Sequence, residues 1–112
     1  MNRIALIITG LVLLPSSADA DLQVRAALYG NELRGHRTAS GETFNPDALT
    51  AAHKSLPFGT CLVVGNPKTG KTVAVRVNDR GPFVSGLTLD LSSGAARAIG
   101  MRSTESVTMR RC

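Results

Sequence analysis

The stretch TVAVRVNDRGPF at residues 72–83 decides the fold. In its first half three valines fall on one face, and threonine, alanine, arginine and asparagine fall on the other. Such alternation predicts a half-buried β-strand over Thr72–Asn78. The DRGP sequence that follows ends the strand in a turn, because glycine and proline signal a change of chain direction. Asp79 therefore stands where an apolar strand reaches solvent.

Further short runs along the chain predict strands separated by turns rich in glycine and proline. Close spacing of such strands is typical of a small barrel or sandwich, so we expect a mainly β fold. Residues 92–99 predict a short helix, with Ser92 as N-cap and Gly100 at its C-terminal stop. The polar residues 31–46 predict an exposed loop. The other predicted strands are Val24–Leu28, Thr60–Val64, Leu87–Leu91 and Ser106–Arg110.

Residues 65–72, GNPKTGKT, match the phosphate-binding pattern G-x-x-x-x-G-K-[ST]. That pattern binds phosphate only when a helix follows, since the helix N-terminus and the loop amides hold the phosphates together. Here the alternating strand at 72–78 follows instead. The motif therefore predicts a hairpin turn, and we expect no nucleotide to bind.

Residues 1–20 have the order of a secretory signal peptide: a basic start, an apolar run at 4–14, and small residues at 18 and 20. The apolar run is shorter than the ~20 residues that a membrane-spanning helix needs. No cysteine follows it, so attachment as a lipoprotein is not expected. We expect a periplasmic or secreted domain at residues 21–112, with no membrane span after processing.

Two cysteines, Cys61 and Cys112, lie in the expected mature domain. An even number in an exported chain suggests a disulfide, and both residues lie on or beside predicted strands, which would then be neighbours. Two unpaired thiols are the alternative. Two cysteines and two histidines show no metal-ligand spacing, so we expect no metal and no cofactor.

The chain carries a net charge of +5, three phenylalanines, one tyrosine and no tryptophan. A basic surface favours anionic partners, which outside the cytoplasm are wall polymers and lipid head groups. No basic patch is interleaved with aromatic residues, so nucleic acid is not an expected partner.

Three residues have the side chains needed for acid–base chemistry. Glu42 lies in a glycine-bearing loop, His53 follows two alanines, and Asp79 ends the strand at 72–78. Two carboxylates and a histidine are sufficient to cleave a glycosidic bond. A structural role remains open for each residue. Asp79 would accept hydrogen bonds from turn amides or pair with Arg80, His53 would have its hydrogen bonds satisfied within the fold, and Glu42 would be a solvated loop residue.

Four segments resemble, in order and spacing, the conserved blocks of the rare lipoprotein A (RlpA) family, and the resemblance covers about residues 29–100. It implies a six-stranded double-psi β-barrel with one or two short helices, as in expansins, barwin and family-45 endoglucanases. Family members that are enzymes cleave peptidoglycan glycan strands without hydrolysis and prefer strands stripped of stem peptides. The segments are TASGE at 38–42, LTAAHKSLPFGT at 49–60, VNDRGPF at 77–83 and DLSSGAARAIG at 90–100.

Carried over by position, the resemblance implies catalytic roles for Glu42, His53 and Asp79. Asp79 would protonate the glycosidic oxygen and then accept the proton of the muramic C6 hydroxyl, which leaves a 1,6-anhydro end. Asn45 departs from the family, because an aspartate is common there. The entry sequence ALYG at 27–30 lacks the usual tryptophan.

We therefore expect a monomeric lytic transglycosylase acting on peptidoglycan glycan strands. Two alternatives remain: a glycan-binding or wall-loosening module without turnover, of expansin-like type, and a hydrolase with the same fold. The candidate substrate-binding residues are Tyr29, Thr38, Ser40, Asn45 and Arg80.

Overall fold

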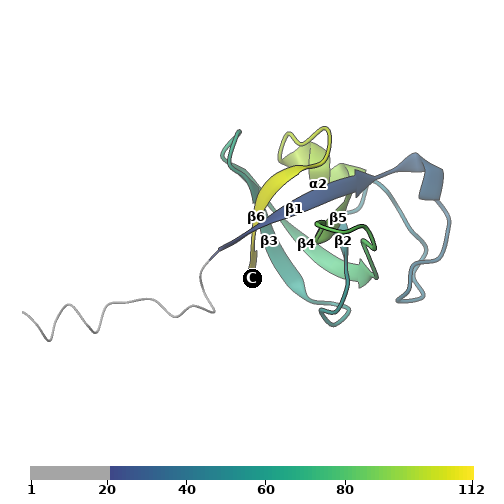
Figure 1. Cartoon of the computed structure of the whole chain (residues 1–112). Coiled ribbons are helices and arrows are strands. Elements are labelled where there is room, and N and C mark those ends of the chain that lie inside the picture. Colours follow the sequence, from purple (N-terminus) through teal and green to yellow (C-terminus); the bar gives the residue numbers. More distant parts are fainter. Residues whose placement is uncertain (1–20) are drawn as a thin grey trace, which may run out of the picture.

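The computed structural model describes residues 21–112, and the expected signal peptide lies outside the described residues (Figure 1). Six strands account for most of the regular structure, and no helix within 21–112 is long and apolar enough to cross a membrane. The elements are β1 (Leu22–Tyr29), η2 (Asn31–Leu33), β2 (Thr50–His53), β3 (Cys61–Asn66), β4 (Lys71–Asp79), β5 (Leu89–Ser92), α2 (Ser93–Ala98) and β6 (Glu105–Arg111).

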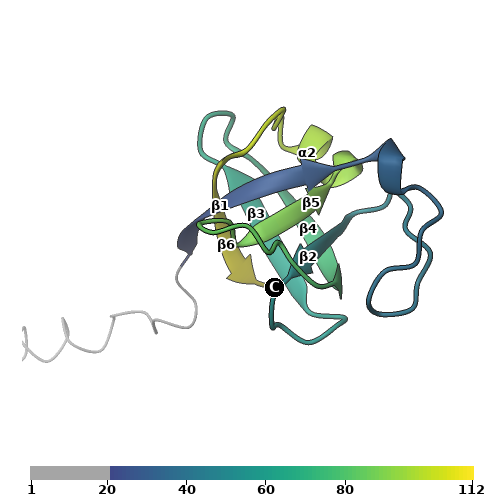
Figure 2. The ribbon, with the colours of Figure 1, turned by 45° about the vertical axis from the view of Figure 1, so that its right-hand side comes forward.

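The six strands close into one barrel in the order β1-β5-β2-β4-β3-β6. β1 pairs with β5 in parallel and β2 pairs with β4 in parallel, whereas the other four pairings are antiparallel. Figure 2 shows β1, β5 and β2 as neighbouring strands of the barrel wall. The predicted mainly β, six-stranded double-psi barrel is confirmed.

The barrel interior is filled by the inward residues of every strand, as expected for a barrel of this size. The three valines of β4 point into this core, as the alternation at 72–78 predicted. Leu89 and Leu91 of β5 are fully buried on either side of Asp90, which therefore points outward. The alternation of β4 and β5 thus places polar residues on the outer wall.

β2 was missed as a strand in the sequence. Its four residues, TAAH, include two alanines and show no alternation that would predict a strand. They become a strand because β4 and β5 supply hydrogen-bonding partners on both sides. Ala51 is then buried in the core, whereas Ala52 faces the outer side of the barrel wall and is also buried, at 2% exposure.

The GNPKTGKT segment forms the turn between antiparallel strands β3 and β4, so the predicted hairpin is confirmed. Asn66 ties this turn to the end of α2, because its amide Nδ2 donates to the carbonyl oxygen of Ile99 over 2.9 Å. The turn borders a hollow of about 180 Å³ lined in part by Lys71 and Thr108.

The predicted helix is confirmed as α2, and it lies at one end of the barrel (Figure 1). Ser92 caps it, since its Oγ accepts a hydrogen bond from the backbone N–H of Ala95 over 3.2 Å. A Cβ on Gly94 would lie 2.7 Å from the carbonyl oxygen of Asp47, so only glycine permits the loop between β1 and β2 to pack this closely.

The loop between β1 and β2 is less exposed than predicted. Thr38, Phe44 and Pro46 are buried because the loop folds back against the barrel wall and α2. Asp47 strengthens this attachment by accepting hydrogen bonds from the guanidinium groups of Arg34 and Arg97. The loop therefore has a defined path across the barrel.

Cys61 and Cys112 form a disulfide, with Cα atoms 5.3 Å apart, which confirms the predicted pairing. The two cysteines lie at adjoining ends of β3 and β6, and the N–H of Cys112 donates to the carbonyl oxygen of Cys61 over 3.0 Å. The bridge fixes the chain's last strand to the barrel.

We expect reduction of this disulfide to lower the melting temperature. Closing a loop of 51 residues stabilises a fold by about 4 kcal/mol in the chain-entropy model, which for a domain this small corresponds to a Tm drop on the order of 15 °C. Calorimetry of the oxidised protein and of a Cys61→Ala/Cys112→Ala variant measures it. Equal Tm values would show that strand pairing alone holds β6.

Candidate active site

Two aspartates lie on the outer wall on either side of Ala52. In the strand register Ala52 of β2 is paired with Asp79 of β4 on one side and with Asp90 of β5 on the other. Neighbouring strands are about 4.8 Å apart, so the two carboxyl side chains flank a single small residue. The small side chain of Ala52 therefore lies between the two acids, and we call this position the floor of the site.

A register shift sets the direction of Asp79. β2 pairs Ala51 with Val77 but the next residue, Ala52, with Asp79, so Asn78 is an extra residue on β4. Such a bulge changes which residues face outward beyond it. Without the shift Asn78 would pair with Ala52, and the carboxyl group of Asp79 would be displaced from the floor.

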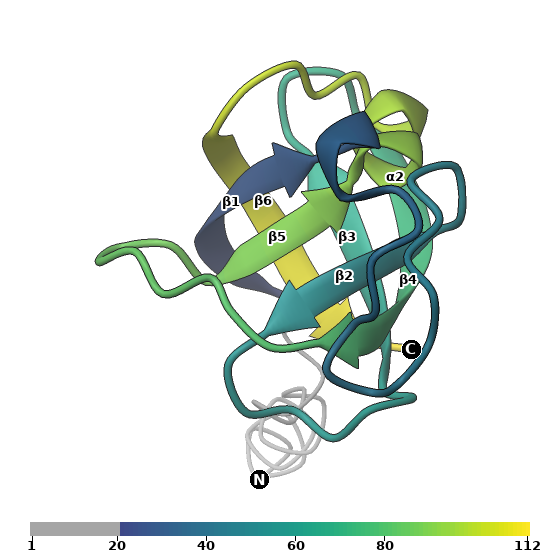
Figure 3. The same ribbon diagram turned by 90° about the vertical axis from the view of Figure 1, so that its right-hand side faces the viewer.

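Asp79 is half-buried and its Oδ1 accepts two backbone hydrogen bonds. The N–H of Ala39 donates over 2.9 Å and the N–H of Arg80 over 2.8 Å. These two bonds hold the carboxyl group in one orientation at the end of β4. The bond from Ala39 also fastens the β1–β2 loop to the end of β4, and Figure 3 shows that loop passing over the ends of β2 and β4.

Asp90 is the functional candidate that the sequence reasoning missed. Burial raises the pKa of its carboxyl above the usual range, and the negative charge of Asp79 raises it further. Both causes favour the protonated acid. Its signal in the sequence was an aspartate between two leucines of an apolar strand, where aspartate is uncommon.

Tyr29, a predicted substrate-binding residue, lies at the end of β1 beside the two aspartates. Its ring stacks on that of Phe44, with centroids 4.8 Å apart. Its hydroxyl is buried and has no hydrogen-bond partner among the described residues. Burial, followed by the charges of Asp79 and Asp90, raises the pKa of Tyr29, so the phenol keeps its proton.

Glu42 is held in an ion pair with Arg76. The two Nη atoms donate to the two carboxylate oxygens over 2.5 and 2.9 Å. The Arg76 guanidinium holds the pKa of Glu42 below its usual range, so Glu42 is a charged acceptor. Ser40 also donates to Glu42, and its hydroxyl shares a 2.9 Å hydrogen bond with that of Thr38.

His53 ends β2, immediately after Ala52. Its Nδ1 accepts hydrogen bonds from the backbone N–H groups of Ser55 and Leu56, both over 3.1 Å, so the ring proton is assigned to Nε2. Burial lowers the pKa of His53, and the nearby positive charges of Arg80 and Lys54 lower it further. The imidazole is therefore a neutral donor at the rim of the floor.

Arg80 fastens the loop that follows His53. Its Nη1 donates to the carbonyl oxygens of His53 over 3.2 Å and Leu56 over 2.8 Å, and its guanidinium lies 4.0 Å from the centroid of Phe58. Asn45, the other residue expected at the rim, is exposed, and its Oδ1 accepts the N–H of Asp47 in a local turn. For both residues contact with substrate stays a prediction.

Among the described residues, some of the predicted catalytic candidates are linked by contacts and others are only near one another. Glu42 and Asp79 are linked through the loop at 38–42, and His53 adjoins the floor formed by Ala52. A single groove serving all three remains a prediction. No group of three or more His, Cys, Asp or Glu residues within 21–112 is placed to hold a metal ion.

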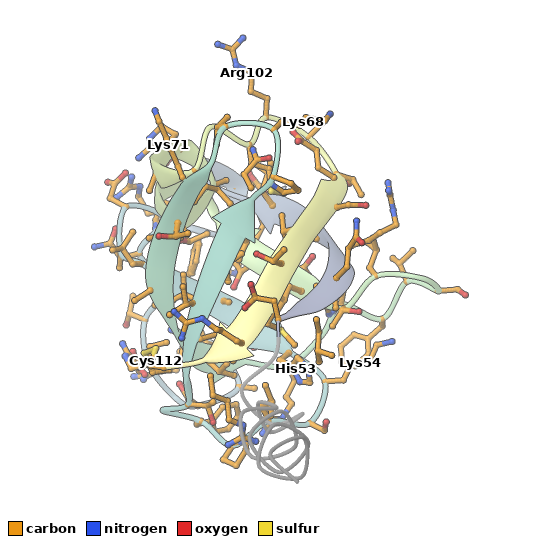
Figure 4. The ribbon with its side chains drawn as sticks, turned by 90° about the vertical axis from the view of Figure 1, so that its left-hand side faces the viewer. His53, Lys54, Lys68, Lys71, Arg102 and Cys112 are labelled. Atoms are coloured by element: carbon orange, nitrogen blue, oxygen red, sulfur yellow. A yellow bond between two sulfur atoms is a disulfide. The ribbon has the colours of Figure 1, made fainter. Side chains whose placement is uncertain are left out.

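Figure 4 shows Lys68, Lys71 and Arg102 at the opposite end of the barrel from His53 and Lys54.

Residues 21–110 match the family model for lytic transglycolases. The chain belongs to this family. It is 58% identical over 79 residues to a probable endolytic peptidoglycan transglycosylase RlpA from Synechocystis, covering 70% of this chain and 25% of that protein. It is 49% identical over 85 residues to the endolytic peptidoglycan transglycosylase RlpA of Campylobacter jejuni, covering 76% and 31%. The predicted RlpA resemblance is confirmed.

The lytic transglycolase domain described here thus spans about a quarter to a third of the length of these curated relatives. Among solved structures it resembles an expansin from Clavibacter michiganensis, with a TM-score of 0.67 and 24% identity over 83% of this chain and 50% of that one. This likeness supports the double-psi barrel fold.

For this lytic transglycolase domain we expect Asp90→Asn to raise Tm at pH 7 and to leave it unchanged near pH 3. The folded-state pKa of Asp90 is above its unfolded value, so native stability falls as pH rises from the unfolded pKa to the folded pKa, and the penalty persists above it. Thermal unfolding at both pH values measures the difference.

Asp47→Asn is the matched control with the opposite sign. Arg34 and Arg97 hold the pKa of Asp47 below its usual range, so its contribution to stability is present at pH 7 and lost in acid. A lower Tm for Asp90→Asn at pH 7 would contradict the buried-acid account.

Proposed function

We propose that this domain cleaves the glycosidic bond between N-acetylmuramic acid and N-acetylglucosamine in peptidoglycan and leaves 1,6-anhydro ends. The observation that carries the proposal is the half-buried Asp90 facing Asp79 across Ala52. The names of the relatives supply the substrate class and favour turnover over a non-catalytic wall-loosening module.

Asp90 is the proton donor in this proposal. Cleavage needs a carboxylic acid that can give a proton to the scissile oxygen, and burial together with the charge of Asp79 shifts the pKa of Asp90 in the direction that favours the protonated form. The sequence had suggested Asp79 for this step. Its Oδ1 is already occupied by hydrogen bonds from the N–H groups of Ala39 and Arg80, so we assign Asp79 the partner role of proton acceptor.

The bond that breaks and the bond that forms both lie within the substrate. Asp90 protonates the bridging oxygen while the bond from that oxygen to muramic C1 breaks. The C6 hydroxyl of the same sugar forms the new bond to C1, and the Asp79 carboxylate accepts the hydroxyl proton. Because the nucleophile belongs to the substrate, the step benefits from proximity and needs no bound water. Proton exchange with solvent then restores both carboxyl groups.

The remaining candidates have supporting roles. The Nε2–H of the neutral His53 is a donor for a sugar hydroxyl or acetamido oxygen. Glu42 carries a charge already balanced by Arg76, which suits a residue that accepts a substrate hydrogen bond and orders the loop at 38–42. Tyr29 lies beside the two acids, with its hydroxyl buried and unpaired among the described residues, and packs the base of the site.

We also propose that the domain acts outside the cytoplasm as a monomer. The support is the order of basic, apolar and small residues at 1–20, the presence of the Cys61–Cys112 disulfide, and a substrate that lies in the cell wall. Disulfides persist in oxidising compartments, which agrees with export.

Product analysis tests the proposal. Mass spectrometry of peptide-free glycan strands after digestion is expected to show 1,6-anhydro ends, and both Asp90→Asn and Asp79→Asn are expected to reduce their rate of formation by at least about a hundredfold. Glu42→Gln is expected to cost less, because it removes a supporting contact.

Each other product has a defined meaning. Reducing ends would indicate a hydrolase, and bound but uncut strands would indicate a binding module. Full activity in Asp90→Asn with loss in Asp79→Asn would restore Asp79 as the proton donor.

A further inference from the structure

The loop between β4 and β5 presents two adjacent exposed apolar side chains near Asp90. Phe83 is 83% exposed and Val84 is 61% exposed. Figure 3 shows this loop, residues 81–88, projecting from the barrel at the start of β5. An exposed aromatic side chain at such a position marks a contact surface.

Gly81 connects this surface to the acid. A Cβ built on Gly81 would lie 3.5 Å from Cε2 of Phe83 and 3.9 Å from Oδ2 of Asp90. The phenylalanine ring and the carboxyl group therefore border the same small space. The φ of +120° at Gly81 disfavours any other residue, so that space stays free of a side chain.

Phe83 has the most exposed aromatic side chain among the described residues, at 83% against 42% for Phe58. The chain has three phenylalanines and one tyrosine. Phe44 and Tyr29 stack on each other, and the Arg80 guanidinium lies over one face of the Phe58 ring. Within residues 21–112 no such partner covers Phe83. The sequence also lacks the tryptophan expected at position 28, where Leu28 packs against the core instead.

We propose that Phe83 is a sugar-binding platform on which a hexosamine ring of the glycan strand stacks, next to the ring whose bond is cleaved at Asp90. The C–H face of a pyranose packs on an aromatic ring, while its hydroxyl groups hydrogen-bond to nearby carboxyls. The identity of the glycan rests on the proposed function. The stacking is the same before and during reaction, so Phe83 contributes to KM and not to kcat.

A tryptophan probe tests the stacking directly. The chain has no tryptophan, so Phe83→Trp introduces a single emitter at the platform. In the Asp90→Asn background, which keeps the strands intact, titration with peptide-free glycan strands is expected to give a saturable blue shift. Val84→Trp, one residue along the same loop, is the matched control and is expected to show none.

Calorimetry on the same samples reports whether the strands bind. Binding without an emission change in Phe83→Trp would overturn the platform, as would an equal change in both tryptophan variants. If only the Phe83→Trp protein fails to bind the strands, the two alanine variants decide. Weaker binding by Phe83→Ala than by Val84→Ala would support the platform, and any other result would overturn it.

Kinetics in the active protein separate this inference from the proposed function. Phe83→Ala is expected to raise KM roughly tenfold with kcat unchanged, whereas Val84→Ala changes neither. An unchanged KM, or a lower kcat at unchanged KM, would overturn the platform and leave the chemistry intact. Saturable emission without any 1,6-anhydro product would retain the platform and reject the transglycosylase.

Discussion

The site depends on the extra residue that β4 inserts opposite β2. Asn78 has no partner in β2, so the strand carries Val77 into the core and Asp79 out beside Ala52 within three residues. β5 reaches the same alanine from the other side with Asp90. The closed barrel prevents these strands from sliding, because every inward residue of both strands is packed in the core. The fold thus fixes two carboxyl groups at a separation set by strand spacing.

The same geometry separates the two acids chemically. Asp79 sits at a strand end, where backbone N–H groups of Ala39 and Arg80 reach its Oδ1. Asp90 lies within a strand and has no such donors among the described residues, so burial and the charge of Asp79 raise its pKa. Two residues of one type therefore differ in their burial and hydrogen-bond partners, and these differences assign the proton-donor role to Asp90.

Three loops complete the surroundings of these acids, and two of them are fastened by their own contacts. Within the β1–β2 loop Asp47 pairs with Arg34, and it joins that loop to Arg97 of α2, while Arg80 holds the loop after His53 through two carbonyl oxygens. The loop carrying Phe83 instead projects from the barrel. Asp47 and Arg80 therefore contribute to the site by holding its loops in place.

Much of this arrangement could be predicted from the sequence. The valine alternation of β4, the capped helix at Ser92 and the pairing of Cys61 with Cys112 all follow from local pattern and chemistry. β2 could not be predicted, because its TAAH sequence becomes a strand only through partners distant in the chain.

The site was predictable to a lesser degree for the same reason. Glu42 was identified as a candidate acid, but its charge is balanced by Arg76, which is 34 residues away in the chain. Asp90 was overlooked, because the sequence shows only an aspartate between two leucines, whereas its raised pKa arises from burial and from the charge of Asp79 across β2. Spacing along the chain shows which side chains are available, whereas the barrel register decides which of them meet.

The pH dependence of kcat/KM for formation of 1,6-anhydro ends tests the central claim, which is that Asp90 donates the proton to the scissile bond. This profile reports the titration of groups in the free protein, and the pKa of Asp90 can be measured independently by NMR. The account predicts that activity falls as pH rises through the measured pKa of Asp90. Activity that stays constant or increases through that titration would contradict it.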